Sequence, residues 1–354
     1  MNRKIWKALG IAVCMLALAA PRAMAELREY LVSNNEHFAD AVGRINNESK
    51  IGDKNEIVLM ENITLGGNYI LTNGKTTTIK GEGKTITVNQ GAGIKVTGGE
   101  TVLNLGAEGY AEKLTIDGNA KGAFITVSGG ATAYMYENVT LQNRMFTGNA
   151  YVLVTGSDPD TRSKSVFNMK GGVIEGGSRA VIAQSGATFN MSGGEIRNCK
   201  GGSGGGVHVY EATFVMSGGT ISGCSASNGG GLCAEKSSTV TITGGTISEC
   251  KGLLGGGLYA DNSAIEISGG VISGCKEIGA GGGLYAENSS TIEISGGTIS
   301  GCKVGAGGGL FVDSSTIRIS GGIISECTTS DTGNGGGLYA KNSTIKITGG
   351  RIEN

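Results

Sequence analysis

The stretch Gly281–Lys303 reads GGGLYAENSSTIEISGGTISGCK, and variants of it follow one another through the second half of the chain. It holds three short segments in which apolar and polar residues alternate, at 284–287, 291–294 and 298–300. Alternation with a period of two is typical of a strand that buries one face. Glycines separate the segments, and glycine marks turns because it adopts backbone conformations that are closed to other residues. One unit therefore predicts three strands and three corners.

The unit recurs with a period of about 25 residues. The glycine triplet begins at residues 204, 229, 255, 281, 307 and 335. A helical repeat is excluded because β-branched residues and glycine are poor helix formers, and a propeller blade needs a longer unit. Three strands in so short a unit predict a triangular coil that stacks on its own copies about 4.8 Å apart. The prediction is an all-β fold, a single-stranded right-handed parallel β-helix (solenoid) of about twelve coils.

The chain divides into four regions. They are a signal peptide over residues 1–25, an N-terminal cap over 26–58, irregular coils over 59–170 with an inserted loop at 155–164, and regular glycine-rich repeats over 171–354. The first region has basic residues, an apolar run from Ala8 to Ala20 and the small-x-small sequence Ala23-Met24-Ala25, which is typical of secretory signal peptides. We expect cleavage after Ala25 and a secreted protein, located outside the cell or on its surface.

The cap region predicts one short helix. Its apolar face consists of Phe38, Ala41, Val42 and Ile45, and Asn34 or Asn35 is suited to begin it. A stack of coils needs such a cap because its end would otherwise expose the core. No equivalent follows the last coil, so end-to-end association there is an expected mode of contact.

Charge and hydropathy narrow the function classes. Without residues 1–25 the chain has 25 Lys and Arg against 30 Asp and Glu, a formal charge of −5. A mildly acidic chain without basic clusters argues against nucleic-acid binding. No later segment approaches 18 continuous apolar residues, so we expect no membrane span.

Three segments resemble the pectin-lyase-like superfamily of right-handed β-helices, and the glycine-rich coils resemble its bacterial surface and adhesin-like members. The segments are IVLMENITL at 57–65, KLTIDGN at 113–119 and ISGGTISGC at 294–302. The resemblance implies the fold but not one activity, because this superfamily includes lyases, hydrolases, adhesins and structural rods.

In a stacked coil each repeat position becomes a column of side chains. The columns of Ile221, Ile247, Ile272, Ile299 and Ile324, and of Leu232, Leu258, Leu284, Leu310 and Leu338, are predicted core. A third column consists of Cys199, Cys224, Cys250, Cys275, Cys302 and Cys327. With Cys233 the cysteines that follow the predicted signal peptide number seven, so at least one stays unpaired. Free buried thiols are the favoured interpretation, with disulfides between coils or a metal as alternatives.

Two outward columns are the predicted binding face. The first contains His208, Cys233, Tyr259, Tyr285, Phe311 and Tyr339, and the second, two residues further along, contains Glu235, Asp261, Glu287 and Asp313. Aromatic rings beside carboxylates suit a glycan or a cell-surface protein, and stacked carboxylates could hold Ca²⁺. No other cofactor is expected. Asn262, Asn288 and Asn342 fall at one corner, where we expect left-handed backbone.

Catalytic motifs of the resembled family are missing. The polygalacturonase-like members have paired aspartates with Gly-His-Gly, and the pectate-lyase-like members an arginine base with calcium carboxylates, but neither pattern occurs here. We therefore predict a secreted or cell-surface non-catalytic rod, adhesin-like, that binds partners along one face. The alternative is a polysaccharide lyase or glycoside hydrolase that uses the irregular coils, with Asp117, Asp158 and Asp160 as candidate residues.

Overall fold

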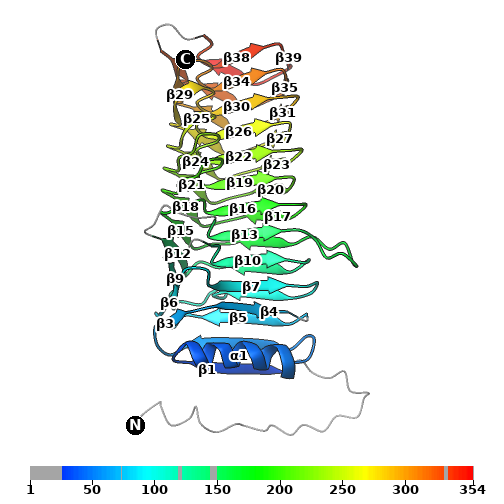
Figure 1. The fold of residues 1–354 in the computed structure, drawn as a ribbon. Helices are drawn as coiled ribbons and strands as arrows, with labels where there is room; N and C mark the ends of the chain where they lie inside the picture. Colours follow the sequence, from blue (N-terminus) through cyan, green and yellow to red (C-terminus); the bar gives the residue numbers. More distant parts are fainter. Residues whose placement is uncertain (1–25, 73, 119–121, 144–149, 331–333, 354) are drawn as a thin grey trace.

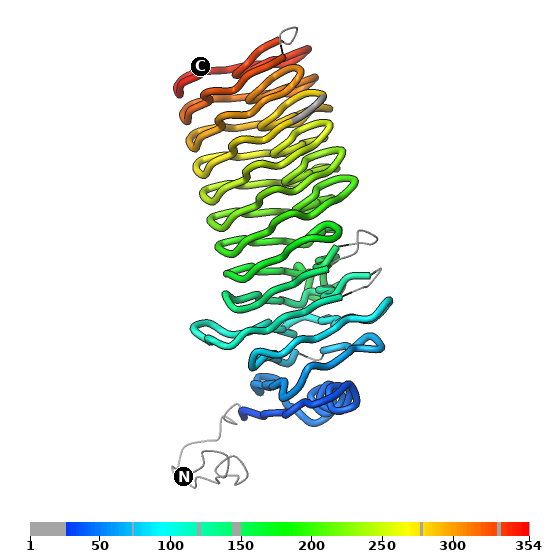
Figure 2. The backbone as a smooth tube through the Cα atoms, turned by 90° about the vertical axis from the view of Figure 1, so that its left-hand side faces the viewer, coloured from blue at the N-terminus to red at the C-terminus, as the bar shows by residue number. Residues whose placement is uncertain are grey.

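The computed structural model describes residues 26–72, 74–118, 122–143, 150–330 and 334–353. The predicted signal peptide lies outside these residues. The chain forms a right-handed parallel β-helix of about twelve coils, with three long parallel sheets that run along the rod (Figure 1). Figure 2 shows the coils stacked directly on one another from the N-terminal to the C-terminal end. The predicted fold class is confirmed.

Each full coil contributes one strand to each of three sheets. Sheet 1 contains β1 (Leu27–Val32), β2 (Lys54–Leu59), β5 (Thr76–Lys80), β8 (Val102–Leu105), β11 (Thr132–Met135), β14 (Val166–Met169), β17 (Thr188–Met191), β20 (Thr213–Met216), β23 (Thr239–Ile242), β27 (Ala264–Ile267), β31 (Thr291–Ile294), β35 (Thr316–Ile319) and β39 (Thr344–Ile347). Sheet 2 contains β3 (Ile63–Leu65), β6 (Thr85–Val88), β9 (Leu114–Gly118), β12 (Val139–Asn143), β15 (Val173–Glu175), β18 (Glu195–Arg197), β21 (Thr220–Ser222), β24 (Thr246–Ser248), β28 (Val271–Ser273), β32 (Thr298–Ser300), β36 (Ile323–Ser325) and β40 (Arg351–Glu353). Sheet 3 contains β4 (Asn68–Leu71), β7 (Gly93–Thr97), β10 (Ile125–Ser128), β13 (Val152–Thr155), β16 (Val181–Gln184), β19 (Val207–Tyr210), β22 (Leu232–Glu235), β26 (Leu258–Asp261), β30 (Leu284–Glu287), β34 (Leu310–Asp313) and β38 (Leu338–Lys341).

A short fourth sheet differs from the expected three strands per coil. Sheet 4 lies between sheets 2 and 3 in the chain order of the later coils and contains β25 (Lys251–Leu254), β29 (Lys276–Ala280), β33 (Lys303–Val304) and β37 (Thr328–Thr329). Earlier coils reach the same position only as isolated bridges, such as Lys200 to Ser225 and Ser225 to Lys251. The glycine-rich segment that the sequence predicted as a plain corner therefore pairs with its own copies as well.

The core consists of the predicted inward columns. Ile221 pairs in register with Ile247, which pairs with Ile272, and all three side chains are buried. The leucine column is also buried as far as Leu310, whereas Leu338 in the last coil is partly exposed. Further towards the N-terminus the rings of Phe167, Phe189 and Phe214 stack inside the rod, with centroids 5.3 and 5.0 Å apart. Fully burying such a side chain stabilises the fold by about 1.5–3 kcal/mol.

The glycine triplets have a steric cause. The first glycine of each regular triplet has a left-handed φ, such as +63° at Gly229. The third has no room for a side chain, because a Cβ atom on Gly231 would lie 2.7 Å from Cγ2 of Ile247. The triplet therefore combines a turn with close packing of one coil against the next.

The N-terminal cap is a strand followed by a helix. Helix α1 (Asn35–Glu48) lies across the first coil, with the predicted residues Phe38, Ala41, Val42 and Ile45 buried beneath it (Figure 1). Asn34 caps it and accepts a hydrogen bond of 2.9 Å from the backbone N–H of His37. The ring of Phe38 packs edge-on against Tyr69 of β4, with centroids 5.1 Å apart. Strand β1 pairs with β2, so sheet 1 already begins within the cap.

The inserted loop joins β13 to β14, between Thr155 and Val166. It is held by an antiparallel bridge between Ser157 and Lys164 and projects from the side of the rod (Figure 1). At the other end of the rod Ile345, Ile347 and Ile352 are exposed. End-to-end association at this coil stays a prediction. None of the helices in the described part of the chain could cross a bilayer.

Candidate functional site

The predicted aromatic column is continuous but is not a solvent-facing surface. Cys233, Tyr259 and Tyr285 are buried, and His208, Phe311 and Tyr339 are half-buried. The rings of Tyr259 and Tyr285 stack 5.7 Å apart, and the stack continues to Phe311 at 5.0 Å. These side chains do point out of the main core, as expected. The expectation that they face solvent is wrong.

Sheet 4 is the reason for this burial. Leu254 at the end of β25 and Ala280 at the end of β29 pack against Cys233, Tyr259 and Tyr285, and together they make a second, small hydrophobic core outside the main one. The sequence did indicate which residues share the column, but the alternation pattern within one strand carries no information about a neighbouring segment that folds over it. The binding role of the aromatic residues stays a prediction, now with little accessible ring surface.

The acidic column is in the predicted register, and its four carboxylates are half-buried. Glu235 pairs with Asp261, and Asp261 pairs with Glu287. Each carboxylate has a partner of its own. Glu287 accepts hydrogen bonds from the hydroxyls of Tyr259 and Tyr285, the latter at 3.2 Å.

Asp261 and Asp313, two further members of the acidic column, also have side-chain partners. Asp261 accepts a hydrogen bond of 2.8 Å from the amide of Asn288, and Asp313 forms an ion pair of 3.3 Å with Lys341. The hydroxyl of Ser314 and the Lys341 ammonium hold the pKa of Asp313 below its ordinary value. Asn288 and its ladder neighbours Asn262 and Asn342 all have a left-handed φ, which confirms the corner that was predicted for them.

The expected calcium site is not assembled among the described residues. No three carboxylates of this column bring oxygen atoms within 4.8 Å of one another in that part of the chain. The partners already provided by tyrosine, asparagine and lysine reduce the repulsion that was the argument for Ca²⁺. Calcium binding therefore stays a prediction without a ligand set.

A different cluster forms where the aromatic column changes its residue type. His208 on β19 lies directly opposite Cys233 on β22, and Glu235 follows two residues later on the same face. Nε2 of His208 lies 2.9 Å from Oε2 of Glu235. Donor atoms of all three side chains lie within 4.8 Å of one another. The hydrogen bond from His208 lowers the pKa of Glu235, whereas burial raises the pKa of the Cys233 thiol.

The cysteine column is a ladder of free, buried thiols. All seven described cysteines are unbridged and buried. The column thiols from Cys199 to Cys302 each donate to the backbone carbonyl of the residue two positions before, such as Cys250 to Ser248 at 3.2 Å. Contact between neighbouring thiols and burial raise the pKa of Cys250, Cys275 and Cys302, to about 12 for Cys302. The free-thiol interpretation agrees with this arrangement.

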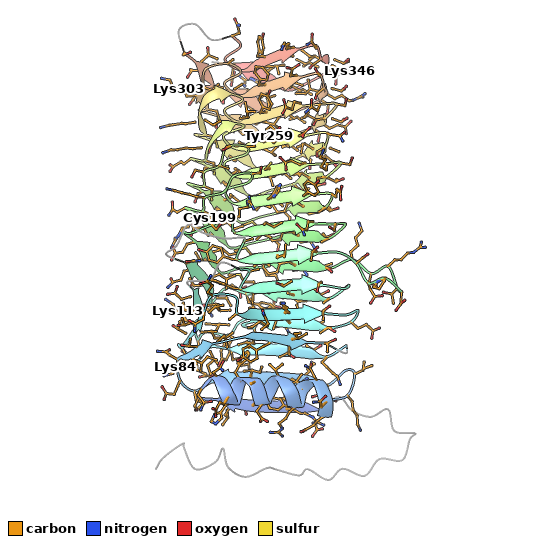
Figure 3. The ribbon with its side chains drawn as sticks, viewed as in Figure 1. Lys84, Lys113, Cys199, Tyr259, Lys303 and Lys346 are labelled. Carbon is orange, nitrogen blue, oxygen red and sulfur yellow. The ribbon has the colours of Figure 1, made fainter. Side chains whose placement is uncertain are left out.

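A lysine column was missed by the sequence analysis. Lys251, Lys276 and Lys303 are exposed and stand in register on the neighbouring strands β25, β29 and β33. Lys200 continues the column two coils earlier, beyond Ser225. The signal was present in the sequence, because each of these four lysines directly follows a cysteine of the cysteine column. Figure 3 shows Lys303 projecting outward at the edge of the rod.

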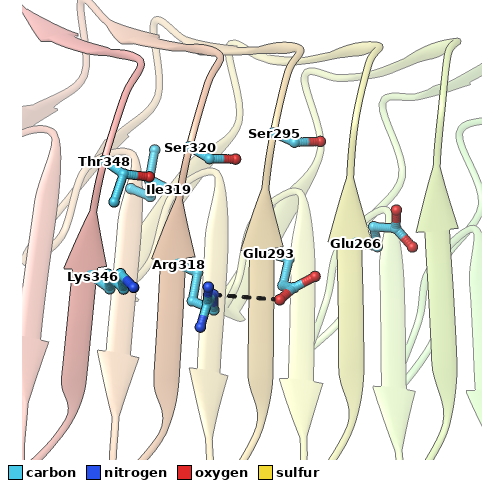
Figure 4. Close-up of a pocket in the computed structure, with 8 residues that line it drawn as sticks. All are labelled: Glu266, Glu293, Ser295, Arg318, Ile319, Ser320, Lys346 and Thr348. Carbon is cyan, nitrogen blue, oxygen red and sulfur yellow. Dashed lines mark ion pairs between the residues drawn. The ribbon is translucent and has the colours of Figure 1, made fainter.

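Charges on sheet 1 are arranged differently. Glu266, Glu293, Arg318 and Lys346 form an outward column there, and they line a shallow surface pocket of about 250 Å³ (Figure 4). Arg318 and Glu293 form an ion pair of 3.6 Å. Acidic and basic residues thus neutralise one another along this face.

The irregular coils contain the residues of the enzymatic alternative, but not as one site. Asp117 lies on sheet 2, where it accepts a hydrogen bond of 3.0 Å from Gln142, its neighbour in the next coil. Asp158 lies on the loop after sheet 3 and accepts hydrogen bonds from the backbone N–H groups of Thr161 at 2.7 Å and Asp160 at 2.9 Å. These bonds lower its pKa. Asp158 therefore stabilises its own loop, on a different side of the rod from Asp117.

Asp117 is itself a member of an outward column of polar residues on sheet 2. Gln142 stands next to Glu175, which forms an ion pair of 2.6 Å with Arg197 in the following coil. A surface hollow of about 340 Å³ opens beside them, lined by Gln142, Asn143, Glu175, Gly176 and Asn198. Asp117 and Glu175 are two coils apart, roughly 10 Å along the rod at the usual strand spacing.

The comparison with protein families agrees with the fold. A family model described as a right handed beta helix region matches residues 161–321. None of the curated proteins matches the chain. A solved structure titled "L. reuteri 53608 SRRP" is 14% identical, with a TM-score of 0.28, and the match covers 91% of this chain and 99% of that chain. The β-helix implied by the resemblance is confirmed, and function has to be argued from the surface of the rod.

Proposed function

We propose that this right-handed β-helix is an exported, non-catalytic rod that binds an extended anionic glycan along the lysine column of sheet 4. The observation that carries the proposal is a row of like charges without compensation. Lys251, Lys276 and Lys303 have no ion-pair partner among the side chains that the structure describes. The predicted partner class, a glycan, is kept, but its contact face moves from the aromatic and acidic columns to the lysines.

Electrostatics give the column a reason to bind anions. Neighbouring lysines in register lie about 4.8 Å apart at the backbone. Two like charges at that distance repel by up to about 1 kcal/mol in water, although long side chains reduce this by spreading apart. A polymer with regularly spaced carboxylate, sulfate or phosphate groups relieves the repulsion at every coil.

The geometry of the rod favours a long ligand over a small one. The column is straight because strands β25, β29 and β33 pair in parallel, each on its own copy. On other faces two carboxylates are neutralised by a neighbouring cation, Glu293 by Arg318 and Asp313 by Lys341. The lysine column is thus a linear array of equivalent contacts, which suits multivalent binding.

The test is binding of polygalacturonate, an anionic glycan, to the purified protein, with neutral dextran as the comparison polymer. We expect polygalacturonate to bind, dextran not to bind, and the affinity to fall as salt is added. The triple variant Lys251→Gln, Lys276→Gln, Lys303→Gln should bind roughly a hundredfold more weakly, at about 1 kcal/mol per lysine.

A matched triple variant controls for net charge. Lys54, Lys164 and Lys346 are exposed lysines far apart on the rod, and changing all three to Gln removes the same charge without touching the column. This control should keep nearly the affinity of the unchanged protein. Equal losses in the two triple variants, or no binding of polygalacturonate at low salt, would contradict the proposal.

The enzymatic alternative has one observation in its favour, the hollow beside the Asp117–Glu175 column. Glu175 lines this hollow and Asp117 stands two coils before it in the same column, and glycoside hydrolysis uses a pair of carboxyl groups. The same polygalacturonate samples serve as its test, since chain cleavage would appear as new reducing ends. Cleavage that is lost in Asp117→Asn but kept in Asp158→Asn would favour an enzyme over a non-catalytic rod.

A further inference from the structure

We propose that His208, Cys233 and Glu235 form a binding site for a transition-metal ion of the zinc class. The three side chains come from two adjacent strands of sheet 3. Cys233 and Glu235 are two residues apart and so point the same way, and His208 stands opposite Cys233 in the preceding coil. This placement puts a nitrogen, a sulfur and an oxygen donor within 4.8 Å of one another.

The donor set selects the metal. Zinc binds imidazole nitrogen, thiolate sulfur and carboxylate oxygen in tetrahedral sites, whereas Ca²⁺ and Mg²⁺ prefer oxygen alone. Three protein ligands leave one position of a tetrahedron. A water molecule would fill it, or the hydroxyl of Ser203, which lies near Cys233.

The surroundings fix the ligands and still allow access. Cys233 is buried, and the side chains of His208 and Glu235 are 14% and 19% exposed. Buried strand positions hold side chains in fewer rotamers, so little ordering is needed when a metal binds. The partly exposed imidazole and carboxylate provide the entry side.

Charge at the site is compatible with a cation. The Arg179 guanidinium lies near both Cys233 and Glu235. Because burial raises the pKa of the Cys233 thiol, a bound metal would displace the thiol proton. Nε of Arg179 is buried and has no hydrogen-bond partner. A metal-bound water or hydroxide would be a partner for this N–H, and a thiolate with a carboxylate balances the two charges of the metal.

Comparison with the following coils indicates that His208 and Cys233 are not the usual residues at these positions of the repeat. In the following coils the positions of His208 and Cys233 are taken by Tyr259, Tyr285, Phe311 and Tyr339, in register. Among the described strands from β19 to β38, only β19 and β22 have metal-binding side chains in place of rings at this position. The change also makes room, since the small thiol leaves the imidazole free to approach the carboxylate.

Cobalt binding tests the proposal, because Co²⁺ replaces Zn²⁺ and reports its ligands by colour. We expect one equivalent of Co²⁺ to give a thiolate-to-cobalt charge-transfer absorption, which one equivalent of Zn²⁺ removes. Cys233→Ala should abolish this absorption. Cys250→Ala, which removes another buried thiol in the separate cysteine column, should keep it.

Two further variants protect the test from misfolding. Glu235→Gln and His208→Gln each remove one ligand while the thiol is kept, and they should weaken Zn²⁺ binding in calorimetry at least about tenfold. No absorption in the unchanged protein would overturn the proposal. It would also be overturned by an absorption that survives in Cys233→Ala, or by unchanged Zn²⁺ affinity in both Glu235→Gln and His208→Gln.

Discussion

Single positions of the repeat differ in burial according to what packs over them. Tyr259 and Glu287 both point out of the main core, yet Tyr259 is buried and Glu287 is half-buried. The Tyr259 hydroxyl donates a hydrogen bond to the Glu287 carboxylate, so a residue of the aromatic column is the partner of a residue of the acidic column. Burial and this carboxylate raise the pKa of Tyr259 above its ordinary value. The phenol therefore stays protonated and keeps donating over the whole physiological pH range.

The cysteine column should be inert towards alkylation in the folded protein. Thiolate is the reactive form, and thiol–thiol contact together with burial raises the pKa of Cys250 and Cys275. In mass spectrometry we expect no iodoacetamide adduct on the native protein at about pH 8 with a chelator present. After unfolding without reductant, all seven described cysteines should be modified. Fewer adducts after unfolding would mean disulfides between coils.

At the scale of elements, a buried serine ladder holds the corner between sheets 3 and 1. It consists of Ser238, Ser263, Ser290, Ser315 and Ser343, and each backbone N–H donates to the side chain of the next serine, such as Ser263 to Ser290 at 3.1 Å. The sequence analysis missed this ladder, although a serine recurs at the same place in each of these units. It provides partners for backbone groups that would otherwise be buried without any.

Removing one serine of the ladder should lower the free energy of unfolding. Ser290→Ala deletes the acceptor for the N–H of Ser263 and the donor to the carbonyl of Glu287. Leaving a buried N–H without a partner costs about 1–3 kcal/mol, which urea unfolding followed by circular dichroism would detect. Ser300→Ala, on the outward face of β32, should change the free energy of unfolding by less than about 0.5 kcal/mol. Equal effects of the two variants would refute a structural role for the ladder.

The inserted loop should depend on the charge of Asp158. Its carboxylate accepts backbone N–H bonds from Thr161 and Asp160, and these lower its pKa. A lowered pKa means that the stabilisation is complete above the unfolded-state value of 3.8 and is lost as pH falls through the folded-state value. Hydrogen exchange of residues 156–165 should therefore be faster in Asp158→Asn than in the unchanged protein at about pH 6.

The same comparison at low pH is the control. As pH falls through the lowered folded-state pKa, Asp158 becomes protonated in both states, and the difference between the two proteins should shrink. A difference of constant size across this range would show that the ionised carboxylate is not what orders the loop.

At the scale of the whole molecule, each coil touches only its neighbours, so stability is local along the rod. Phe38→Ala in helix α1 removes a fully buried ring, at a cost of about 3–5 kcal/mol. We expect faster hydrogen exchange in β3 and β4, next to the cap, and unchanged exchange in β31 and β35. His37→Ala, an exposed neighbour in the same helix, should alter neither region. Uniform loss of protection along the rod would mean that the solenoid unfolds as one unit.

Both proposed sites belong to this scale as well, because they follow from the stacking of coils. Four lysines, of which consecutive ones lie 25 to 51 residues apart in sequence, become one row. His208 and Cys233, 25 residues apart, become direct neighbours. Neither arrangement exists within a single unit.

The amino-acid sequence by itself determined the coil, the register and the composition of every column. It could do so because each strand pairs with its own copy in the next coil. Equivalent positions of two successive repeats therefore lie opposite each other, as Ile221 and Ile247 do. The helical cap was readable for a similar reason, since Phe38 and Ile45 mark one helix face. These features depend on spacing along the chain, which a repeat makes visible.

Only the tertiary structure decided which outward columns remain exposed. Sheet 4 packs Leu254 and Ala280 over the tyrosine column and leaves Lys251, Lys276 and Lys303 in solvent. Alternation within a strand distinguishes inside from outside, but it cannot show that a later segment of the same coil folds back over the outside. Burial depends on contacts between segments, and those are fixed only when the whole coil closes.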